Sequence, residues 1–206
     1  MTVQHSKLLA GALMVASSLY ATTVFAQTGG ALATGEPVGF YAGAGLGVAK
    51  AKDACDLSGT GFAGSCDDRD ESWNIFAGYQ FHPNIAVEAG YVDLGEVKAD
   101  GAIGGTPVNL VGEAEAFELV GVGSYPVAPN ISIYAKAGVF RWDSKGGATV
   151  GGAAFRTSDD GTDFTGGVGA QYRFTRNVAA RLEWQHYNDV GGADVNVLRA
   201  ALRYNF

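Results

Sequence analysis

The sequence predicts an all-β protein, an eight-stranded antiparallel up-and-down transmembrane β-barrel. Three observations favour this fold class. Eight segments alternate an apolar residue with a polar or small one, which is the period of a β-strand and not of a helix. The connections between these segments alternate between long and short, as in barrels of the outer membrane. The charged residues well inside the segments fall on the polar side of the alternation.

The first 26 residues have the pattern of a secretory signal peptide. Lys7 gives a positive start, an apolar stretch covers 8–20, and Val24 and Ala26 stand at positions −3 and −1 before the expected cleavage site. The stretch is too short and too interrupted for a membrane anchor. We therefore expect residues 1–26 to be removed, 27–38 to form a polar and mobile lead-in, and 39–206 to form one barrel domain.

Composition narrows the class of protein further. The chain has 206 residues, 31 glycines, 47% hydrophobic residues and a formal net charge of −7. Glycine at this level disfavours a helical bundle, and no long apolar run follows Ala26, so a helical membrane protein is excluded. An acidic chain is also a poor partner for nucleic acid.

The first four strands are expected at 39–49, 72–81, 85–91 and 113–125. In the first, an apolar face that includes Phe40 and Leu46 lies opposite alternating glycines, and in the second Trp73 and Ile75 lie opposite Asn74. A tight turn at 82–84 joins the second and third strands. The segment 50–71 is expected to be a long acidic loop that holds both cysteines, and 94–112 is expected to be another long loop, with glycines at 101, 104 and 105 and a proline at 107.

The last four strands are expected at 131–142, 162–174, 178–187 and 195–206. The turns 126–130 and 175–177 are short, the loop 188–193 is of intermediate length, and 143–161 is a third long loop with five glycines. The closing strand places Leu198, Leu202 and Phe206 on one side and two arginines on the other. An apolar stripe that ends on a terminal Phe, opposite charge, indicates lipid on one face and a polar lumen on the other.

Charges inside the strands support this orientation. Eight of them share the inward parity, namely Glu88, Glu118, Lys136, Arg173, Arg181, Glu183, Arg199 and Arg203. By chance about half would point outward, because successive side chains alternate between faces. An outward Arg or Lys costs about 2–4 kcal/mol at the bilayer midplane. Asp93, Glu115 and Arg141 break the parity, but each lies at a loop-side strand end, where the cost is small.

A soluble β-sandwich or lipocalin-like barrel is the alternative to a membrane barrel. Such folds bury their apolar face inward, and they give no reason for aromatic residues at the strand ends. The membrane interpretation places these aromatics in two interfacial girdles. They are Tyr79, Phe81, Tyr91, Tyr125, Tyr172, Phe174, Trp184, Tyr204 and Phe206.

An eight-stranded barrel is just wide enough to be filled by its own side chains. Charges buried there have to be paired and hydrogen-bonded. We therefore predict a lumenal charge network of Glu88, Glu118, Lys136, Arg181, Glu183, Arg199 and Arg203. Two interpretations stay open, a static polar core and a gate or narrow passage of low conductance.

Several segments resemble the membrane domain of OmpA-like outer-membrane proteins. Tyr125-Pro126, the stretch 133–138 and Arg141-Trp142 are similar to the passage between that family's fourth and fifth strands. The stretches 167–169 and 180–185 are similar to the passage between its sixth and seventh strands. The resemblance covers roughly 39–206, and the order and spacing of the fragments make it specific.

The resemblance implies roles for particular residues. Family members use a lumenal cluster of Glu, Arg and Lys to plug or gate the barrel, and the matching positions are Lys136, Arg181 and Glu183. The closing segment 202–206 is similar to the assembly signal of such barrels, which implies that Phe206 is read by the barrel-assembly machinery. No counterpart of the peptidoglycan-binding domain of two-domain members follows, so wall anchoring is not expected.

The sequence also contains a cysteine pair, an acidic run and a glycine-rich stretch that could suggest other sites. Cys55 and Cys66 are expected to form a disulfide within one loop, since the exported chain meets an oxidising compartment and no further soft ligands suggest a metal. The acidic run 67–71 favours a solvated surface over a divalent-cation site. The glycines at 43–47 alternate within a strand and do not open a helix, so they are not a nucleotide-binding loop.

Catalysis is not expected either. Small barrels of the outer membrane include enzymes that act on lipid A, which need a nucleophile and a base. After residue 26 the only histidines are His82, in a short turn, and His186, outward near the loop-side rim with no Ser two positions away. We expect no catalytic residues, no metal and no cofactor.

The sequence thus favours an outer-membrane barrel with a structural or surface role. A small porin-like channel is the first alternative, and an adhesin or host-factor binder acting through 50–71, 94–112 and 143–161 is the second. The expected partners are outer-membrane lipids, lipopolysaccharide and the barrel-assembly machinery, with a monomer as the expected state. Loops carry binding roles independently of the scaffold, so an extracellular ligand is left unnamed.

Overall fold

A computed structural model describes residues 35–52, 55 and 62–206 of the chain, which fall in one unit, Leu32–Phe206. The expected signal peptide at 1–26 and the expected lead-in as far as residue 34 lie outside the described residues. Nine strands form the described part: β1 (Gly39–Ala51), β2 (Phe62–Asp67), β3 (Arg69–His82), β4 (Ile85–Ile103), β5 (Thr106–Ala128), β6 (Ile131–Val150), β7 (Ala153–Arg173), β8 (Val178–Val190) and β9 (Ala193–Asn205). Among the described residues, no helix has the length and apolar character needed to cross a membrane.

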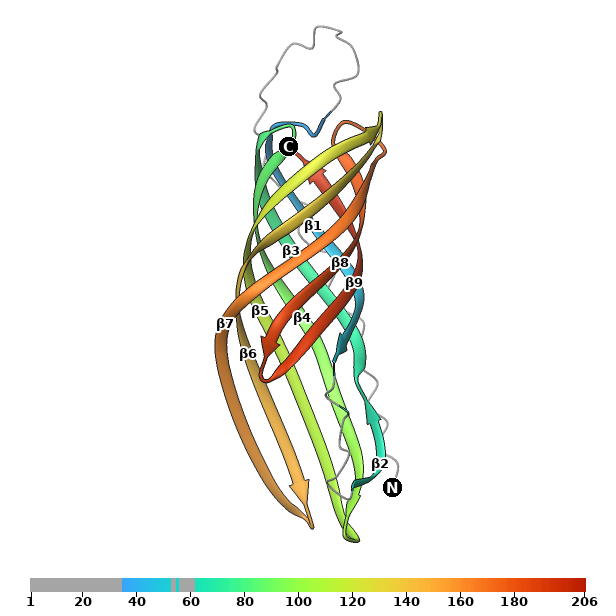
Figure 1. Cartoon of the computed structure of the whole chain (residues 1–206), viewed down its shortest axis with the longest axis vertical. Coiled ribbons are helices and arrows are strands. Elements are labelled where there is room, and N and C mark those ends of the chain that lie inside the picture. Colours follow the sequence, from blue (N-terminus) through green and yellow to red (C-terminus); the bar gives the residue numbers. More distant parts are fainter. Residues whose placement is uncertain (1–34, 53–54, 56–61) are drawn as a thin grey trace, which may run out of the picture. The chain divides into compact units, whose positions relative to one another are not determined.

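Eight of these strands close into an antiparallel ring (Figure 1). The sheet runs in the order β4, β3, β1, β9, β8, β7, β6, β5, and a further β4–β5 pairing joins its two ends. The first and last strands of the described part, β1 and β9, pair from Tyr41–Asn205 to Ala51–Val195. Consecutive strands of the ring are neighbours throughout, so the predicted eight-stranded up-and-down barrel is confirmed.

The ninth strand corrects the prediction that 50–71 is a single long loop. β2 pairs with β4 alone, from Phe62–Ile103 to Asp67–Lys98, and lies outside the ring. β1 extends to Ala51, and β3 begins at Arg69. The polar and glycine-rich composition of this segment concealed the strand, because its residues pair beyond the part of the barrel where one face is apolar.

The prediction of long loops at 94–112 and 143–161 was wrong for a related reason. Both segments are mostly strand, and each contains a two-residue hairpin turn. The φ angles are 57° and 83° at Gly104-Gly105 and 55° and 90° at Gly151-Gly152. Positive φ at both central positions is what such a turn requires, and glycine supplies it without strain. Figure 1 shows these two hairpins projecting beyond the β8–β9 hairpin, at the end opposite the C-terminus.

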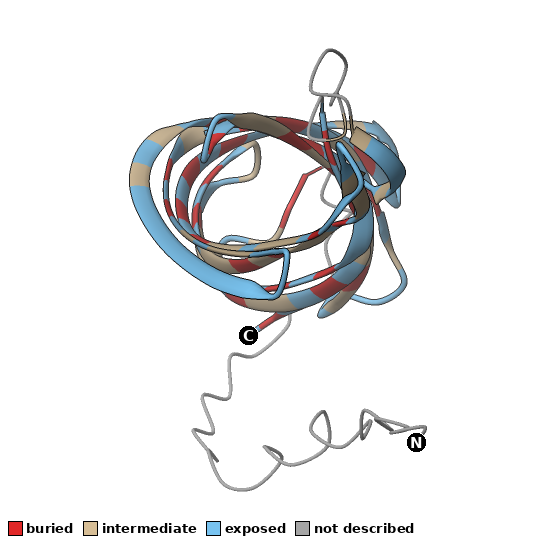
Figure 2. Cartoon of the chain, turned by 90° about the horizontal axis from the view of Figure 1, so that it is seen from below, coloured by how far each residue is buried: buried red, intermediate tan, exposed pale blue. Residues whose placement is uncertain are grey.

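Side chains alternate between the two faces of the ring. Figure 2 shows the ring end-on, with buried and exposed stretches following one another along its strands and one long stretch that is exposed throughout. The outward positions are apolar and exposed, including Phe40 (67%), Leu119 (54%), Phe164 (68%) and Leu202 (62%). In water such a continuous apolar surface would be unstable, whereas in a bilayer it is the lipid-facing belt.

The three charges that break the parity are each paired on the outer face of the long-strand end. The Trp73 indole N–H donates to Asp93 at 3.0 Å, and the Tyr91 hydroxyl donates to Glu115 at 2.5 Å. Arg141 pairs with Asp160 at 2.7 Å. Their positions mark where the apolar belt gives way to the polar surface of the projecting hairpins.

The interior of the ring contains two apolar clusters. One lies toward the projecting hairpins and includes Val92, Phe140, Trp142 and Tyr187. The other includes Tyr41, Phe76, Val120 and Tyr134. Buried polar and charged side chains share the interior with these clusters. Side chains of both kinds thus occupy the interior of the ring, as expected for a barrel of eight strands.

The orientation of the apolar belt gives a direct prediction. Leu182 faces outward near the middle of β8 and is 58% exposed. Replacing it with Arg should lower the free energy of unfolding in lipid vesicles by about 2–4 kcal/mol, because the charge must enter hydrocarbon. Urea unfolding followed by tryptophan fluorescence would measure this change.

The matched control is Thr149→Arg, at an exposed position of β6 beside the β6–β7 turn. It should change the free energy of unfolding by no more than about 0.5 kcal/mol. Equal effects of the two substitutions would contradict the proposed lipid-facing surface.

Candidate functional site in the barrel lumen

The lumen gathers charged side chains from five strands of the ring. The seven residues of the expected network all point inward, and none is more than 6% exposed. They come from β4 (Glu88), β5 (Glu118), β6 (Lys136), β8 (Arg181 and Glu183) and β9 (Arg199 and Arg203). Inward parity on each strand is enough to bring them together, because the ring is narrow.

Lys136 lies at the centre of one group of contacts. Its Nζ is 2.8 Å from Glu183 and 3.4 Å from Glu118. Arg199 approaches the same Glu183 oxygen at 3.4 Å. The other Glu183 oxygen accepts a hydrogen bond from the Tyr134 hydroxyl at 2.9 Å. Glu118 accepts further hydrogen bonds from Gln185 at 2.7 Å and from Tyr187 at 2.9 Å.

Arg181 forms a second group with Glu88. Its Nη1 is 2.6 Å from Glu88 Oε1, which also accepts a hydrogen bond from the Tyr41 hydroxyl at 2.8 Å. The guanidinium lies over the rings of Phe76 and Tyr134, at 5.1 Å and 5.0 Å from their centroids. Aromatic faces attract a cation, so the rings replace part of the hydration that Arg181 loses.

Arg203 departs from the expectation that it would pair with Glu88, Glu118 or Glu183. Its guanidinium carbon is 3.6 Å from the ring centroid of Tyr41, and it donates to Asn205 at 3.0 Å and to Gln80 at 3.2 Å. The acidic group nearest to it is Glu36, at 3.8 Å.

Glu36 is the functional residue that sequence reasoning missed. It belongs to the segment expected to be a mobile lead-in, yet it is only 4% exposed, so that expectation is wrong for this residue. Periodicity could not find it, because Glu36 precedes β1 and has no strand parity. A signal was nevertheless present, since the expected network held three carboxylates and four cations.

With Glu36 included, the fully buried charges balance. Four carboxylates, Glu36, Glu88, Glu118 and Glu183, stand against the four cations Lys136, Arg181, Arg199 and Arg203. Balance matters because an unpaired charge in a dry interior costs several kcal/mol. Arg173 lies beside Glu36 at the rim, with its side chain 15% exposed.

The charged layer leaves almost no free space. The cavity among Glu88, Lys136, Arg181, Glu183 and Arg199 measures about 10 Å³. That volume is at the lower limit for holding a single water molecule. At this level of the barrel, side chains occupy nearly all the space between these five residues.

The remaining expected site residues lie outside the lumen. Cys55 and Cys66 are joined by a disulfide, with Cα atoms 5.7 Å apart. Phe206 is 78% exposed, its ring packs on Tyr204 at 5.2 Å, and its N–H donates to the Phe40 carbonyl at 3.0 Å. These contacts hold the last residue against β1 while its ring faces outward.

The acidic run and the histidines are placed at the surface. Asp68 pairs with Lys50 at 3.7 Å, and the Asp70 carboxylate accepts the Glu96 N–H at 2.9 Å. His82 accepts the Asn84 N–H in the β3–β4 turn, and His186 stacks on Trp184. No group of three or more His, Cys, Asp or Glu in the described part of the chain is arranged to hold a metal ion.

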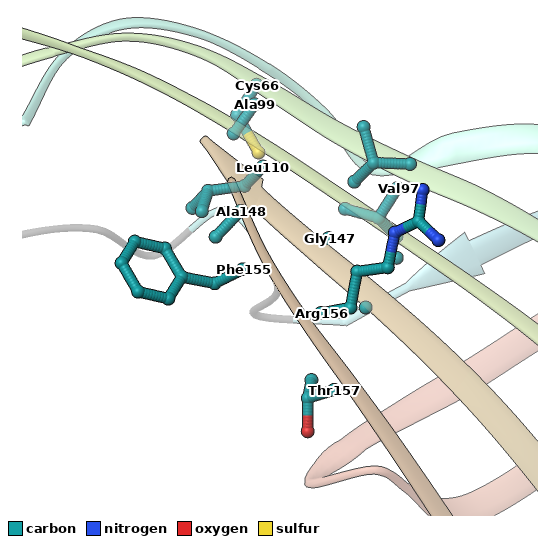
Figure 3. Close-up of a pocket in the computed structure, with 12 residues that line it drawn as sticks. Cys66, Val97, Ala99, Leu110, Gly147, Ala148, Phe155, Arg156 and Thr157 are labelled. Carbon is teal, nitrogen blue, oxygen red and sulfur yellow. The ribbon is translucent and has the colours of Figure 1, made fainter. Parts of the chain in front are cut away.

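The projecting hairpins form a second candidate site (Figure 3). A pocket of about 370 Å³ lies on their inner face, lined mostly by apolar residues such as Val97, Leu110, Ala148 and Phe155. In Figure 3, Phe155 lies beside Ala148, and Arg156 projects near Val97. The outer face is more polar. There Lys98 donates to Glu96, and this hydrogen bond raises the pKa of the Lys98 ammonium.

One edge of this projecting sheet is unpaired. β7 pairs with β6 along its whole projecting part but with β8 only from Thr165 onward. In the described structure the residues 153–164 therefore have one strand neighbour. Two aspartates cover part of the open edge, because Asp159 accepts the Asp160 N–H at 3.0 Å and Asp163 accepts the Phe164 N–H at 2.6 Å.

Comparison with known proteins points to one family. The model of the OmpA-like transmembrane domain matches residues 37–204. Outer membrane protein A of Shigella flexneri is 32% identical over 161 residues, which cover 75% of this chain and 43% of that protein. The chain thus spans less than half the length of this curated relative.

Solved structures share the fold at low sequence identity. The N-terminal β-barrel domain of Pseudomonas aeruginosa OprF has a TM-score of 0.54 at 13% identity, covering 84% of this chain and 99% of that one. Yersinia pestis Ail, solved in complex with the heparin analogue sucrose octasulfate, has a TM-score of 0.51 at 12% identity, covering 82% and 99%. At these identities the likeness concerns the fold alone.

The contacts of Lys136 generate a prediction. Lys136→Met removes the cation that Glu118 and Glu183 share, so two buried carboxylates lose their main partner. The free energy of unfolding in lipid vesicles should fall by about 3–5 kcal/mol. Lys145→Met is the control, since Lys145 is exposed on the projecting part of the same strand, and it should be nearly neutral. A Lys136→Met barrel as stable as the control would contradict the network.

Proposed function

Since the chain belongs to the OmpA-like transmembrane domain family and is a protein of the outer membrane, we propose that its barrel is a sealed structural and surface-exposed element and not an open pore. The observation that carries this proposal is the charge-balanced lumen with its cavity of about 10 Å³. Separating Arg181 from Glu88 would leave two buried charges without an ionic partner, which opposes opening.

The apolar layer on the side of the projecting hairpins supports the same function. Phe140 and Trp142 lie beyond the buried Lys136 on β6, and both are buried. An ion would have to cross this layer as well as the charged one. The alternative of a small porin-like channel therefore requires two barriers to move together.

Planar-bilayer recording of the folded protein tests this proposal. We expect no discrete conductance steps from the wild-type chain, because no continuous aqueous path crosses the lumen. The control is Phe140→Ala combined with Lys136→Ala, which removes one large side chain from each barrier and should produce steps. Reproducible steps from the wild-type chain at the same voltage would favour the porin-like alternative.

The proposal includes how the protein reaches its membrane and what surrounds it there. Export would depend on a signal peptide at 1–26, and insertion would depend on recognition of Phe206 by the barrel-assembly machinery. Lipids and lipopolysaccharide would then surround a monomer. A Phe206→Ala chain that accumulates in the outer membrane, folded and in wild-type amounts, would contradict the assigned role of Phe206.

A second function, binding of an extracellular protein, is favoured by the projecting sheet. An unpaired strand edge can accept an extended peptide as an additional strand, and an adjacent pocket can hold one of its side chains. Here the edge of β7 and the pocket beside Phe155 supply both features. Asp159 and Asp163 give the edge negative charge, so the proposed partner is an extended, basic segment with an apolar anchor.

The projecting sheet can be tested without touching the barrel. Ser158→Pro removes a backbone N–H from the edge of β7, and Phe155→Ala removes an apolar wall of the pocket. Both should lower the capture of extended basic, apolar-containing sequences from a peptide array by at least about tenfold, while the barrel stays folded. Thr149→Ala, on the opposite face of β6, is the control. Unchanged capture by both variants would remove this second function.

A further inference from the structure

Glu36 lies at the end of the barrel where the short turns and the C-terminus are found. Its side chain enters the lumen among inward-facing residues of three strands, Ser132 on β6, Gln171 and Arg173 on β7, and Arg203 on β9. Short turns are periplasmic in barrels of this class, so these residues surround the periplasmic mouth.

Each carboxylate oxygen of Glu36 has two polar partners. Oε1 accepts a hydrogen bond from the Ser132 hydroxyl at 2.8 Å and lies 3.4 Å from Arg173 Nη2. Oε2 accepts a hydrogen bond from Gln171 Nε2 at 2.6 Å and lies 3.8 Å from Arg203 Nη1. Charge-assisted contacts of this kind are stronger than neutral ones, and burial increases the cost of losing them.

The backbone of Gly35 and Glu36 also forms hydrogen bonds with residues at the periplasmic mouth. The Glu36 N–H donates to the Pro83 carbonyl at 3.0 Å, and Arg173 donates to the Gly35 carbonyl at 2.9 Å. A Cβ on Gly35 would stand only 2.5 Å from the Pro83 Cβ, so a larger residue cannot approach as closely. These contacts fix where the Glu36 side chain enters.

The same donors connect Glu36 with the rest of the lumen. Gln171 donates to Glu36 through Nε2 and accepts from Arg181 Nε at 2.9 Å, which links the mouth to the Arg181–Glu88 pair. Arg203 has one acidic partner among the described residues, and that partner is Glu36. Without this carboxylate the fully buried groups would carry four positive and three negative charges.

We propose that Ser132, Gln171, Arg173 and Arg203 form a carboxylate-binding site in the periplasmic mouth and that Glu36 is its built-in ligand. The site lies outside the lumenal cluster formed by Lys136, Arg181 and Glu183. It uses a residue from before the first strand to neutralise the last arginine of the barrel. Removal of the Glu36 side chain leaves a cationic cavity that accepts a small free carboxylate such as formate or acetate.

Chemical rescue tests the site. The folded Glu36→Ala protein in lipid vesicles should have a larger unfolding equilibrium constant than the wild-type protein, because Arg203 is left without an acidic partner. Acetate at about ten times its dissociation constant should lower that constant about tenfold. Chloride at the same ionic strength should not, and Glu113→Ala, which removes an exposed carboxylate on β5, should respond equally to both salts. Equal responses of Glu36→Ala to acetate and chloride would overturn the proposal.

A second variant keeps the test decisive if Glu36→Ala folds poorly. Glu36→Ala combined with Arg203→Met removes both members of the pair, so the double variant should fold better than Glu36→Ala and should no longer respond to acetate. An acetate response retained by the double variant would place binding elsewhere and contradict the site. This readout is separate from conductance, so a conducting wild-type barrel would refute the sealed lumen and leave the carboxylate site standing.

Discussion

The need to compensate charge inside a narrow, dry barrel is the constraint on which this structure depends. Lipid surrounds the ring, so charged side chains of the strands cannot turn outward without a cost of about 2–4 kcal/mol for Arg or Lys at the midplane. They turn inward and meet one another, as Lys136 meets Glu118 and Glu183. The strand parity, the outward apolar belt and the filled lumen all follow from this one requirement.

The same constraint divides the molecule along its length. Where the ring is complete, every strand has two neighbours and the charges well inside the strands point to the interior. Beyond the ends of β8 and β9, charged side chains no longer have to point inward. There the β4–β5 and β6–β7 hairpins carry charge on their outer face and an apolar pocket on their inner face (Figures 1 and 3). The chain thus combines a charge-compensated barrel with an outer sheet that is not confined by lipid.

Alternation predicted the eight ring strands, the direction of every charge well inside them and the location of the short turns. Alternation did not predict the strands where neither face meets hydrocarbon, because the alternating pattern arises from lipid on one face. The projecting parts of β4 to β7 meet no hydrocarbon, so their polar and glycine-rich sequence resembled a loop. Glu36 stands before β1, where no period applies, and only the mismatch between three expected carboxylates and four cations hinted at it. The sequence did not predict β2 for the same reason, because β2 pairs with the projecting part of β4 and meets no hydrocarbon.

A double-mutant cycle between Lys136 and Glu183 tests most directly the claim that compensated charge holds the lumen closed. The two single replacements by Met and the double replacement would be compared by reversible unfolding in lipid vesicles. We predict a coupling free energy of about 1–3 kcal/mol, with the double variant more stable than the sum of the single effects implies. Additive effects, with a coupling indistinguishable from zero, would contradict the account.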